Sequence, residues 1–208
     1  MKKLPVTFYQ RENVLEIAKE LLGKLLVTKF PLAGRAGNGI ITSGRIIEVE
    51  AYNGVIDKAS HAVGGRRTAR NEIMYANGGV AYIYLCYGIH HLFNVVTNYR
   101  DIPHAILIRA LDPVKGINIM LKRTGKTKLD NTLTRGPGNL SKALGISTLF
   151  SGFSLRSTEL FLADDGYSFD KKDITASPRI GVDYAGKDAF LPYRFFIKGN
   201  PFISGNPK

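Results

Sequence analysis

A two-residue alternation of apolar and polar side chains over Ile40–Tyr52 is the clearest local pattern in this chain. Successive side chains of a β-strand point to opposite faces, so the alternation predicts a strand. One face carries Ile47, Val49 and Ala51, and the other carries Ile46, Glu48, Glu50 and Tyr52. The predicted strand therefore directs two carboxylates and a phenol to the same side.

Apolar residues spaced three to four positions apart predict helices elsewhere in the chain. Glu12–Leu22 has this spacing and is followed by Gly23, a residue that suits the C-terminal cap of a helix. Two further helices are expected over Pro113–Arg123, where proline fits the first turn, and over Leu140–Leu144. Thr68–Tyr75 is expected to form one or two helical turns.

Short runs rich in apolar and aromatic residues predict the remaining strands. These strands are expected over Leu25–Lys29, Val80–Cys86, Ile89–Thr97, Ala105–Leu111, Leu160–Ala163, Ile174–Arg179 and Arg194–Ile197. The second and third of them meet at Tyr87-Gly88, which predicts a hairpin with Tyr87 at its tip. Loops are expected over Pro31–Asn38 and Asn53–Gly65. No repeat or linker divides the 208 residues, so one domain is expected over 1–208, with tails at 1–11 and 199–208.

The charge balance favours a polyanionic partner. Lys and Arg number 29 against 17 Asp and Glu, a formal net charge of +12, and such a field is typical of proteins that bind nucleic acid. No apolar run is long enough to span a bilayer, and Met1-Lys2-Lys3 leads into Leu4-Pro5 without the core of a signal peptide. The single cysteine, Cys86, fits a reducing compartment. We therefore expect an intracellular protein with no membrane partner.

Glu50 is the candidate for acid–base chemistry. Beside the phenol of Tyr52, in a basic chain, its carboxylate could act as a general base for water, and a solvated strand glutamate is the alternative. Glu48 and Glu50 together could also ligate a metal or form a two-carboxylate hydrolase. The chain has no His-Glu-x-x-His or paired-cysteine motif, so no metal is expected. His61, taken alone, is typical of a surface or core histidine.

Aromatic and basic residues gather after this strand. Tyr82, Tyr84 and Tyr87 are three of the ten tyrosines and fall within six residues. Stacking on nucleic-acid bases contributes about 1–3 kcal/mol per base, although aromatic residues also pack the cores of strands. The loop Gly64–Asn71 holds three arginines and suits phosphate contacts, with a solvated basic loop as the alternative. Arg109 interrupts an apolar strand, so it is expected to pair with a carboxylate or to reach a phosphate.

Short motifs follow one another in a fixed order along nearly the whole chain. They are Glu20-Leu21-Leu22-Gly23-Lys24, Ile47-Glu48-Val49-Glu50-Ala51-Tyr52, Ala59-Ser60-His61, Arg70-Asn71, Ala81-Tyr82-Ile83-Tyr84, Tyr87-Gly88-Ile89-His90, Asn94-Val95-Val96, Leu107-Ile108-Arg109-Ala110-Leu111-Asp112-Pro113, Gly136-Pro137-Gly138, Lys142-Ala143-Leu144 and Arg194-Phe195-Phe196-Ile197. In this order they resemble the alkyladenine (3-methylpurine) DNA glycosylase family. Each motif is weak by itself, and their joint order is highly specific.

The resemblance implies a fold and a reaction. The fold is α+β, a single mixed domain around a curved, mainly antiparallel β-sheet with peripheral helices, and the family uses no metal or other cofactor. A damaged base is flipped out of double-stranded DNA, and its N-glycosidic bond is hydrolysed. Glu50 would deprotonate the water that attacks the sugar C1′. Glu48 and His90 receive no role from the resemblance.

The resemblance also implies which residues contact the substrate. Tyr52, His61 and Tyr84 would line the base pocket, and Asn94 would exclude bases with the wrong exocyclic group. Arg109 would help to hold the backbone of the flipped nucleotide. Tyr87 would fill the gap left in the duplex. The further DNA contacts are expected from Ile89, Arg66, Thr68, Arg70 and Asn71.

Two functions remain open on the sequence. The first is a monofunctional DNA glycosylase of base excision repair that acts on alkylated purines as a monomer. No lysine stands beside Glu50 and Tyr52 as a Schiff-base nucleophile, which disfavours a strand-cleaving lyase. The alternative is a non-catalytic basic module that binds nucleic acid, which explains the charge and the tyrosines but gives Glu50 no task. The preferred lesion among alkylated and deaminated purines stays open.

Overall fold

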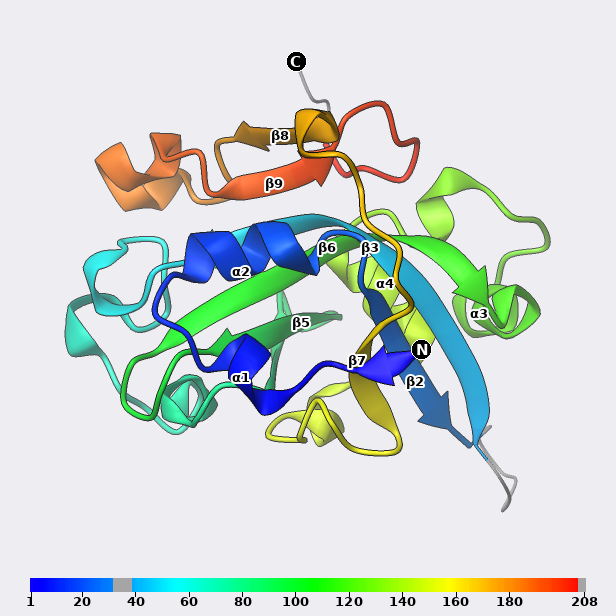
Figure 1. Ribbon diagram of the computed structural model, residues 1–208, viewed down its shortest axis with the longest axis horizontal. Coiled ribbons are helices and arrows are strands. Elements are labelled where there is room, and N and C mark those ends of the chain that lie inside the picture. The colour runs from blue at the N-terminus through cyan, green and yellow to red at the C-terminus, as the bar shows by residue number, and fades with distance from the viewer. Residues whose placement is uncertain (32–38, 206–208) are drawn as a thin grey trace.

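Strand β3 (Ile40–Tyr52) lies in the middle of a curled antiparallel sheet (Figure 1). The computed structural model describes residues 1–31 and 39–205. The strands follow one another in the order β1, β7, β2, β3, β6, β5 and β4, and β9 pairs with both β3 and β8. Their bounds are Lys2–Lys3 (β1), Leu25–Phe30 (β2), Ala81–Cys86 (β4), His90–Thr97 (β5), His104–Lys115 (β6), Leu160–Asp164 (β7), Ile174–Ser177 (β8) and Arg194–Ile197 (β9).

The second half of β3 has a neighbouring strand on each edge. On one edge, β6 pairs with β3 from Ser43 to Tyr52. On the other edge, β2 pairs with residues up to Arg45 and β9 pairs with Glu48, Val49 and Glu50. Glu48 lies opposite Ala110 of β6 and Phe196 of β9, and the register with β6 shifts on either side of Glu48. Both carboxylates of β3 are therefore enclosed by strands, and the exposed fraction of Glu48 and of Glu50 is 0%.

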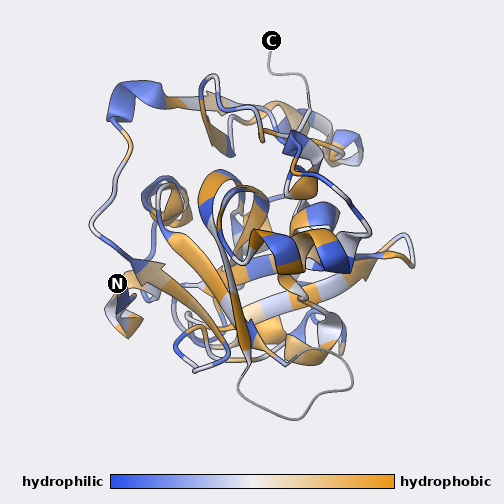
Figure 2. Cartoon of the chain, turned by 90° about the vertical axis from the view of Figure 1, so that its right-hand side faces the viewer, coloured by the Kyte–Doolittle hydropathy of each residue, from blue (hydrophilic) through white to orange (hydrophobic). Residues whose placement is uncertain are grey.

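Helix α2 (Val14–Leu21) buries its apolar stripe in the main core. Asn13 caps its start by accepting hydrogen bonds from the backbone N–H groups of Leu15 and Glu16. The other α-helices are α1 (Val6–Tyr9), α3 (Ile117–Thr124) and α4 (Pro137–Leu144). Turns of 3₁₀ helix occur at Gly54–Ile56, Val63–Gly65, Glu72–Tyr75, Asn131–Leu133, Thr148–Phe150, Lys171–Asp173 and Asp183–Phe190. Hydrophobic residues are concentrated along the strands (Figure 2). The predicted α+β class with a mainly antiparallel sheet is confirmed.

The helix predicted from Pro113 begins later than expected. Pro113 lies in β6 opposite Gly44, next to a register shift, where a residue without an N–H group is tolerated. Gly116 has φ +77°, and a Cβ there would lie 2.5 Å from the carbonyl oxygen of Ile41. The chain therefore turns at Gly116, and α3 starts at Ile117. Similarly, α4 starts at Pro137, with proline in the first turn rather than in a preceding loop.

Both predicted tails are part of the folded structure. Near the start of the chain, β1 pairs with β7 and Tyr9 is fully buried. Near its end, Ile203 packs in the main core and Ser204 is bound to a buried carboxylate. The described part of each expected tail is thus held by strand pairing or by core contacts. The loop predicted over 31–38 lies outside the described residues apart from Pro31.

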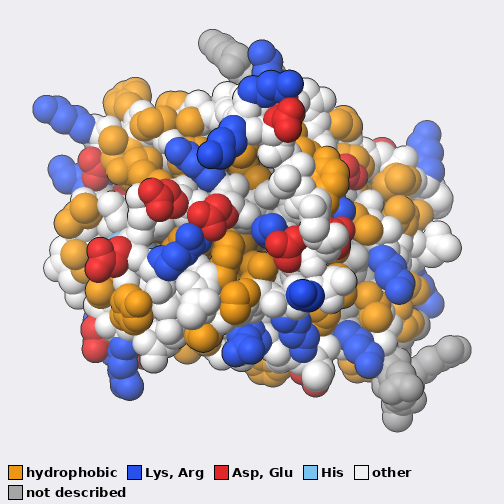
Figure 3. Space-filling model, viewed as in Figure 1, with side chains coloured by type: hydrophobic (Ala, Val, Ile, Leu, Met, Phe, Trp, Pro, Cys, Tyr) orange, Lys and Arg blue, Asp and Glu red, His pale blue; other side chains and the backbone are white. Residues whose placement is uncertain are grey.

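The surface mixes charges of both signs. On the face that carries α2, basic side chains are interspersed with acidic and apolar ones (Figure 3). Several cations there are paired, including Arg11 with Glu20 and Lys24 with Asp164. Among the described residues, no helix combines the length and the apolar character needed to cross a membrane.

Candidate active site

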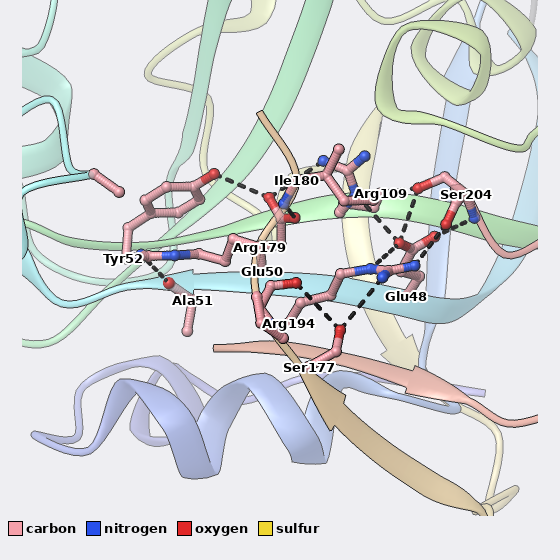
Figure 4. A network of polar contacts seen from close by, with 12 residues as sticks. Glu48, Glu50, Ala51, Tyr52, Arg109, Ser177, Arg179, Ile180, Arg194 and Ser204 are labelled. Carbon is pink, nitrogen blue, oxygen red and sulfur yellow. Dashed lines mark hydrogen bonds and ion pairs between the residues drawn. The ribbon is translucent and has the colours of Figure 1, made fainter. Parts of the chain in front are cut away.

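Glu50 accepts three hydrogen bonds from side chains and backbone around it. Tyr52 Oη donates to Oε2 at 3.0 Å, Arg109 Nη1 donates to Oε2 at 3.2 Å, and the backbone N–H of Ile180 donates to Oε1 at 2.7 Å (Figure 4). Burial raises the pKa of Tyr52 well above its usual value, and the negative charge of Glu50 raises it further. The Tyr52 phenol therefore stays protonated and can donate its hydrogen bond to Glu50.

Glu48 is bound more completely than Glu50. Its Oε1 accepts from Arg194 Nε at 2.7 Å, from Ser204 Oγ at 2.8 Å and from Arg109 Nε at 3.2 Å, and its Oε2 accepts from the Ser204 N–H at 2.6 Å. A carboxylate offers about four acceptor positions. Glu48 receives four bonds within the protein, three at Oε1 and one at Oε2, whereas Glu50 receives three from the described residues, two at Oε2 and one at Oε1.

Arg109 joins the two carboxylates. It is 7% exposed and forms ion pairs with Glu48 and with Glu50, both at 3.2 Å. Burial alone would lower the pKa of Arg109, but the charges of Glu50 and Glu48 outweigh it and raise that pKa above its usual value. Arg109 thus pairs with carboxylates, the first of the two contacts expected from the sequence. It also lines the outer cleft, so the second expected contact, with a phosphate, stays open.

Two adjoining hollows lie beside these carboxylates. The inner cavity has a volume of about 40 Å³, and Tyr52, His61, Tyr84 and Asn94 are among its lining residues. That volume holds only a few water molecules. The outer cleft has a volume of about 560 Å³ and shares Tyr52, His61 and Tyr84 with the inner cavity. The three residues that donate hydrogen bonds to Glu50, namely Tyr52, Arg109 and Ile180, all line this cleft. The Glu50 carboxylate therefore lies directly beneath the cleft.

His61 and the tyrosines of β4 form an aromatic cluster. His61 Nδ1 lies 2.8 Å from Tyr82 Oη, and the rings of His61 and Tyr84 are 4.7 Å apart, edge to face. Burial, with the charges of Arg70 and Arg66, lowers the pKa of His61 below its usual value. The imidazole is therefore neutral at neutral pH, and the cluster offers flat, largely uncharged walls for a planar ligand.

The β4–β5 hairpin presents an exposed tyrosine, as predicted. Tyr87 is 90% exposed with φ +51°, and Ile89 beside it is 71% exposed. Tyr82, the second residue of β4, is 2% exposed and packs in a small core cluster. The three tyrosines of this region thus differ in their surroundings. Tyr82 lines only the inner cavity, Tyr84 lines both hollows, and Tyr87 borders the outer cleft from the exposed tip.

The loop Gly64–Asn71 presents only some of its predicted contact residues. Arg66, Thr68 and Arg70 are exposed. Asn71 is buried, and its side chain accepts from the N–H of Thr68 and donates to the carbonyls of His61 and Arg66. The structure therefore places Asn71 inside the loop, where it fixes the backbone that carries the two arginines.

The position of Asn94 fits the predicted pocket. It is 3% exposed, and its amide nitrogen donates to the carbonyls of Tyr82 and Leu92, both at 3.2 Å. These two bonds fix the orientation of the amide group. Asn94 therefore presents a fixed polar group to the inner cavity that it lines.

Three residues of the site have no signal in the sequence. Ile180 donates its backbone N–H to Glu50, Arg179 lies beside the Tyr52 ring, and Tyr184 lines both hollows. All three belong to the segment 179–184, which is about 130 residues beyond Glu50. Neither a motif nor a periodic pattern links such distant positions, and a backbone donor carries no residue preference at all.

Other hollows and clusters do not compete with this site. A separate cavity of about 760 Å³ lies between α2 and the segment 164–176, and none of the predicted site residues lines it. Within residues 1–31 and 39–205, no group of three or more His, Cys, Asp or Glu side chains is arranged to hold a metal ion. The chemistry of the site is a buried carboxylate with one open acceptor position, beneath a cleft with aromatic walls.

Known proteins resemble this chain over nearly its full length. The sequence profile of the family described as methylpurine-DNA glycosylase matches residues 7–201. A Chlamydia abortus protein named "Putative 3-methyladenine DNA glycosylase" is 47% identical over 195 residues, which cover 93% of this chain and 97% of that protein. Proteins of the same name from Bacillus cereus and Chlamydia felis are 45% and 46% identical, over 96% and 93% of this chain and 98% and 95% of their own lengths.

Proposed function

The chain belongs to the methylpurine-DNA glycosylase family, and we propose that it releases methylated purines, 3-methyladenine among them, with Glu50 as the general base. It is a DNA glycosylase of base excision repair and a hydrolase of N-glycosyl bonds. One observation supports the choice of Glu50. Its carboxylate keeps one acceptor position unoccupied by the described residues, directly beneath a cleft large enough for a ligand.

The proposed reaction needs little beyond positioning and one proton transfer. A water molecule donates a hydrogen bond to the open position of Glu50 and attacks the sugar C1′. Its proton passes to Glu50, and the electron pair of the C1′–N bond leaves with the base. An alkylated purine is cationic, so it departs as a neutral base. Arg109 and Tyr52 hold the carboxylate in place by donating to Oε2.

Base flipping accounts for the aromatic residues. A base inside the stack cannot reach a buried carboxylate, so the nucleotide must leave the duplex. In the proposed complex, Tyr52, His61 and Tyr84 enclose the flipped base, and Asn94 meets its edge. Tyr87 enters the gap left in the stack. Exposed cations at Arg66 and Arg70 contact phosphates, with Thr68 and Ile89 beside the backbone.

The product should be an abasic site with an intact strand. A lyase needs an amine that forms a Schiff base with the sugar. Among the described residues that line the inner cavity and the outer cleft there is no lysine. The absence of such an amine therefore favours a monofunctional glycosylase.

We also propose that the partner is double-stranded DNA, that the active form is a monomer, and that the protein acts inside the cell, where the DNA is.

The test is release of free base from a duplex that contains one 3-methylated purine. We expect wild-type protein to release the base in the presence of EDTA and to leave a strand that breaks only after alkali. Glu50→Gln should bind the duplex but lower the single-turnover rate by about 10²–10⁴, since an amide cannot accept the proton. No release by wild-type protein, with binding retained, would favour the non-catalytic binding module.

Glu48→Gln is the matched control for Glu50→Gln. Both variants make the same chemical change on the same face of β3, and both weaken an ion pair with Arg109. Glu48→Gln also disturbs the pair with Arg194, so it should lower the melting temperature at least as much. Its base-release rate, measured where the protein is folded, should fall far less. An inactive Glu48→Gln beside an active Glu50→Gln would show that the base was assigned to the wrong carboxylate.

A further inference from the structure

Arg179 lies at the junction of three segments that meet at the site. It is 5% exposed, and its guanidinium carbon is 4.9 Å from the centre of the Tyr52 ring (Figure 4). Nη1 donates to the Ala51 carbonyl at 2.9 Å, and Nη2 donates to the Asp188 carbonyl at 3.2 Å. Both terminal nitrogens also bind Asp57, at 2.5 and 2.8 Å. One planar group thus holds β3, the loop after it and the segment 183–190.

Asp57 extends this arrangement into the loop that carries His61. Its carboxylate accepts from the N–H of Asn53 at 3.0 Å and from the N–H of Ala59 at 2.9 Å. The side chain is almost fully buried, so the ion pair with Arg179 is shielded from water. The carbonyl of Ala59 in turn accepts from Tyr184 Oη at 3.2 Å. The loop is therefore fixed by its contacts with Arg179 and with the far wall of the cleft.

The residue after Arg179 touches the general base. The N–H of Ile180 is the only donor to Oε1 of Glu50 among the described residues, at 2.7 Å. The place of that N–H depends on where the backbone at Arg179 is held. Displacing the guanidinium would move a donor to Glu50 and remove the flat surface against which Tyr52 rests.

We infer that the buried pair of Arg179 and Asp57 is a positioning device for Glu50 and Tyr52, a role that rests on the proposed glycosylase function. Neither side chain needs to touch the substrate. The pair sets the direction of the Ile180 donor, and hence the direction of the open acceptor position on Glu50. It also sets the plane of the Tyr52 ring. A misplacement of about 1 Å in such groups can cost about 10² in rate.

Arg179→Lys tests the inference with little change in charge. Lysine can keep an ion pair with Asp57, but it lacks the planar fork that also reaches Ala51 and Asp188 and lies over the Tyr52 ring. We expect the single-turnover rate of base release at saturating enzyme to fall by about 10- to 100-fold. The dissociation constant for the lesion duplex should stay within about twofold of wild type, since the exposed cations proposed to contact phosphates are unchanged.

The chain provides a close control in Arg45. Arg45 also binds an aspartate with both terminal nitrogens (Asp165, 3.1 and 2.8 Å), donates to a backbone carbonyl (Gly23, 2.7 Å) and stacks on a tyrosine (Tyr167, 4.1 Å). It precedes Glu50 by five residues on β3, about 17 Å along a strand. Arg45→Lys should therefore lower stability through the same kind of contacts and leave the rate within about twofold.

Asp57→Asn is the second variant and loosens the same pair from its other side. It should also lower the rate without weakening binding, and its effect should not add to that of Arg179→Lys in the double variant. Each variant is assayed at a temperature where thermal melting shows it to be folded. Wild-type rates for Arg179→Lys, or rate losses equal to those of Arg45→Lys, would overturn the inference.

Two further results have a clear meaning. If neither Arg179→Lys nor Asp57→Asn folds at any temperature, Arg179 and Asp57 act in stability alone, and the positioning role is overturned. A wild-type protein that releases no base would instead reject the proposed function. The two failures are distinct, because the first leaves wild-type base release intact.

Discussion

Tyr87 can be tested as the residue that fills the gap in the duplex, because its exposure separates that role from a role in stability. A fully enclosed tyrosine buries about 150–250 Å². Tyr87 is 90% exposed, so only about a tenth of that area, roughly 20 Å², is removed from water. At about 25 cal/mol per Å², truncation to alanine should cost about 0.5 kcal/mol of folding free energy. In a chain of 208 residues this lowers the melting temperature by about 1–2 °C.

The expected effect of Tyr87→Ala on activity is much larger. Extruding a nucleotide costs a few kcal/mol of stacking and pairing, and a ring inserted into the gap offsets part of that cost. Losing about 3 kcal/mol of this compensation lowers the single-turnover rate on duplex DNA by about 10². Tyr87→Phe keeps the ring and should remain active. The loss should shrink for a lesion opposite a mismatch, where the base is already poorly stacked.

Single-turnover base release, run beside thermal melting, measures both quantities. Tyr99→Ala is the control, because Tyr99 is 51% exposed and is absent from the linings of both hollows at the site. The reasoning would be refuted if Tyr87→Ala melted normally and released the base from duplex substrates at the wild-type rate. A fall of many degrees in its melting temperature would instead show that Tyr87 supports the fold, as truncation of a core aromatic costs about 3–5 kcal/mol.

Three other predictions concern charge, pH and the C-terminal segment. Arg66→Ala should reduce the log–log salt slope of duplex binding by about 0.9. Arg67→Ala should change that slope less, because Arg67 is paired with Glu72 and Asp101. Equal changes of slope in a salt titration of the two variants would contradict this prediction. The pKa of His61 is lower in the folded protein than in the unfolded chain. As pH falls below about 6.5, the unfolded chain therefore binds a proton before the folded protein does, and the free energy of unfolding should decline. Melting curves of His61→Gln should show a shallower decline, with His104, also lowered by burial, supplying the remainder. Truncation after Gly199 removes both Ser204 bonds to Glu48 and should cost about 2–6 kcal/mol in denaturant unfolding, while an unchanged midpoint would mean that the segment is dispensable.

Local pattern was enough to predict β3 and most other elements, because alternation and helical spacing are properties of neighbouring residues. It failed at Pro113, where a proline that suits a helix start is accommodated in β6 beside a register shift. It failed again at both chain ends, where polar and short segments are held by distant partners. Pairing of β1 with β7 spans about 160 residues, and no local pattern reports it.

The residues of the site also fall into those that local sequence predicts and those that depend on distant contacts. Glu50 and Tyr52 could be placed on one face of a strand from their spacing, and the hairpin put Tyr87 at a tip. Asn71 was expected to contact DNA, yet a buried amide that closes its own loop looks identical in sequence to an exposed one. Arg179 and Ile180 act on Glu50 and Tyr52 through contacts that only the folded chain creates.

Glu48 and Glu50 show why burial and charge alone do not identify a general base. Both are fully buried carboxylates on the same face of β3, and Arg109 binds both. The difference lies in their other partners. Those of Glu48 come from β9 and the C-terminal segment, and Ser204 donates to both of its oxygens. Those of Glu50 line a cleft and leave one position open, and in the proposed reaction this is where a water molecule arriving with a substrate donates its proton.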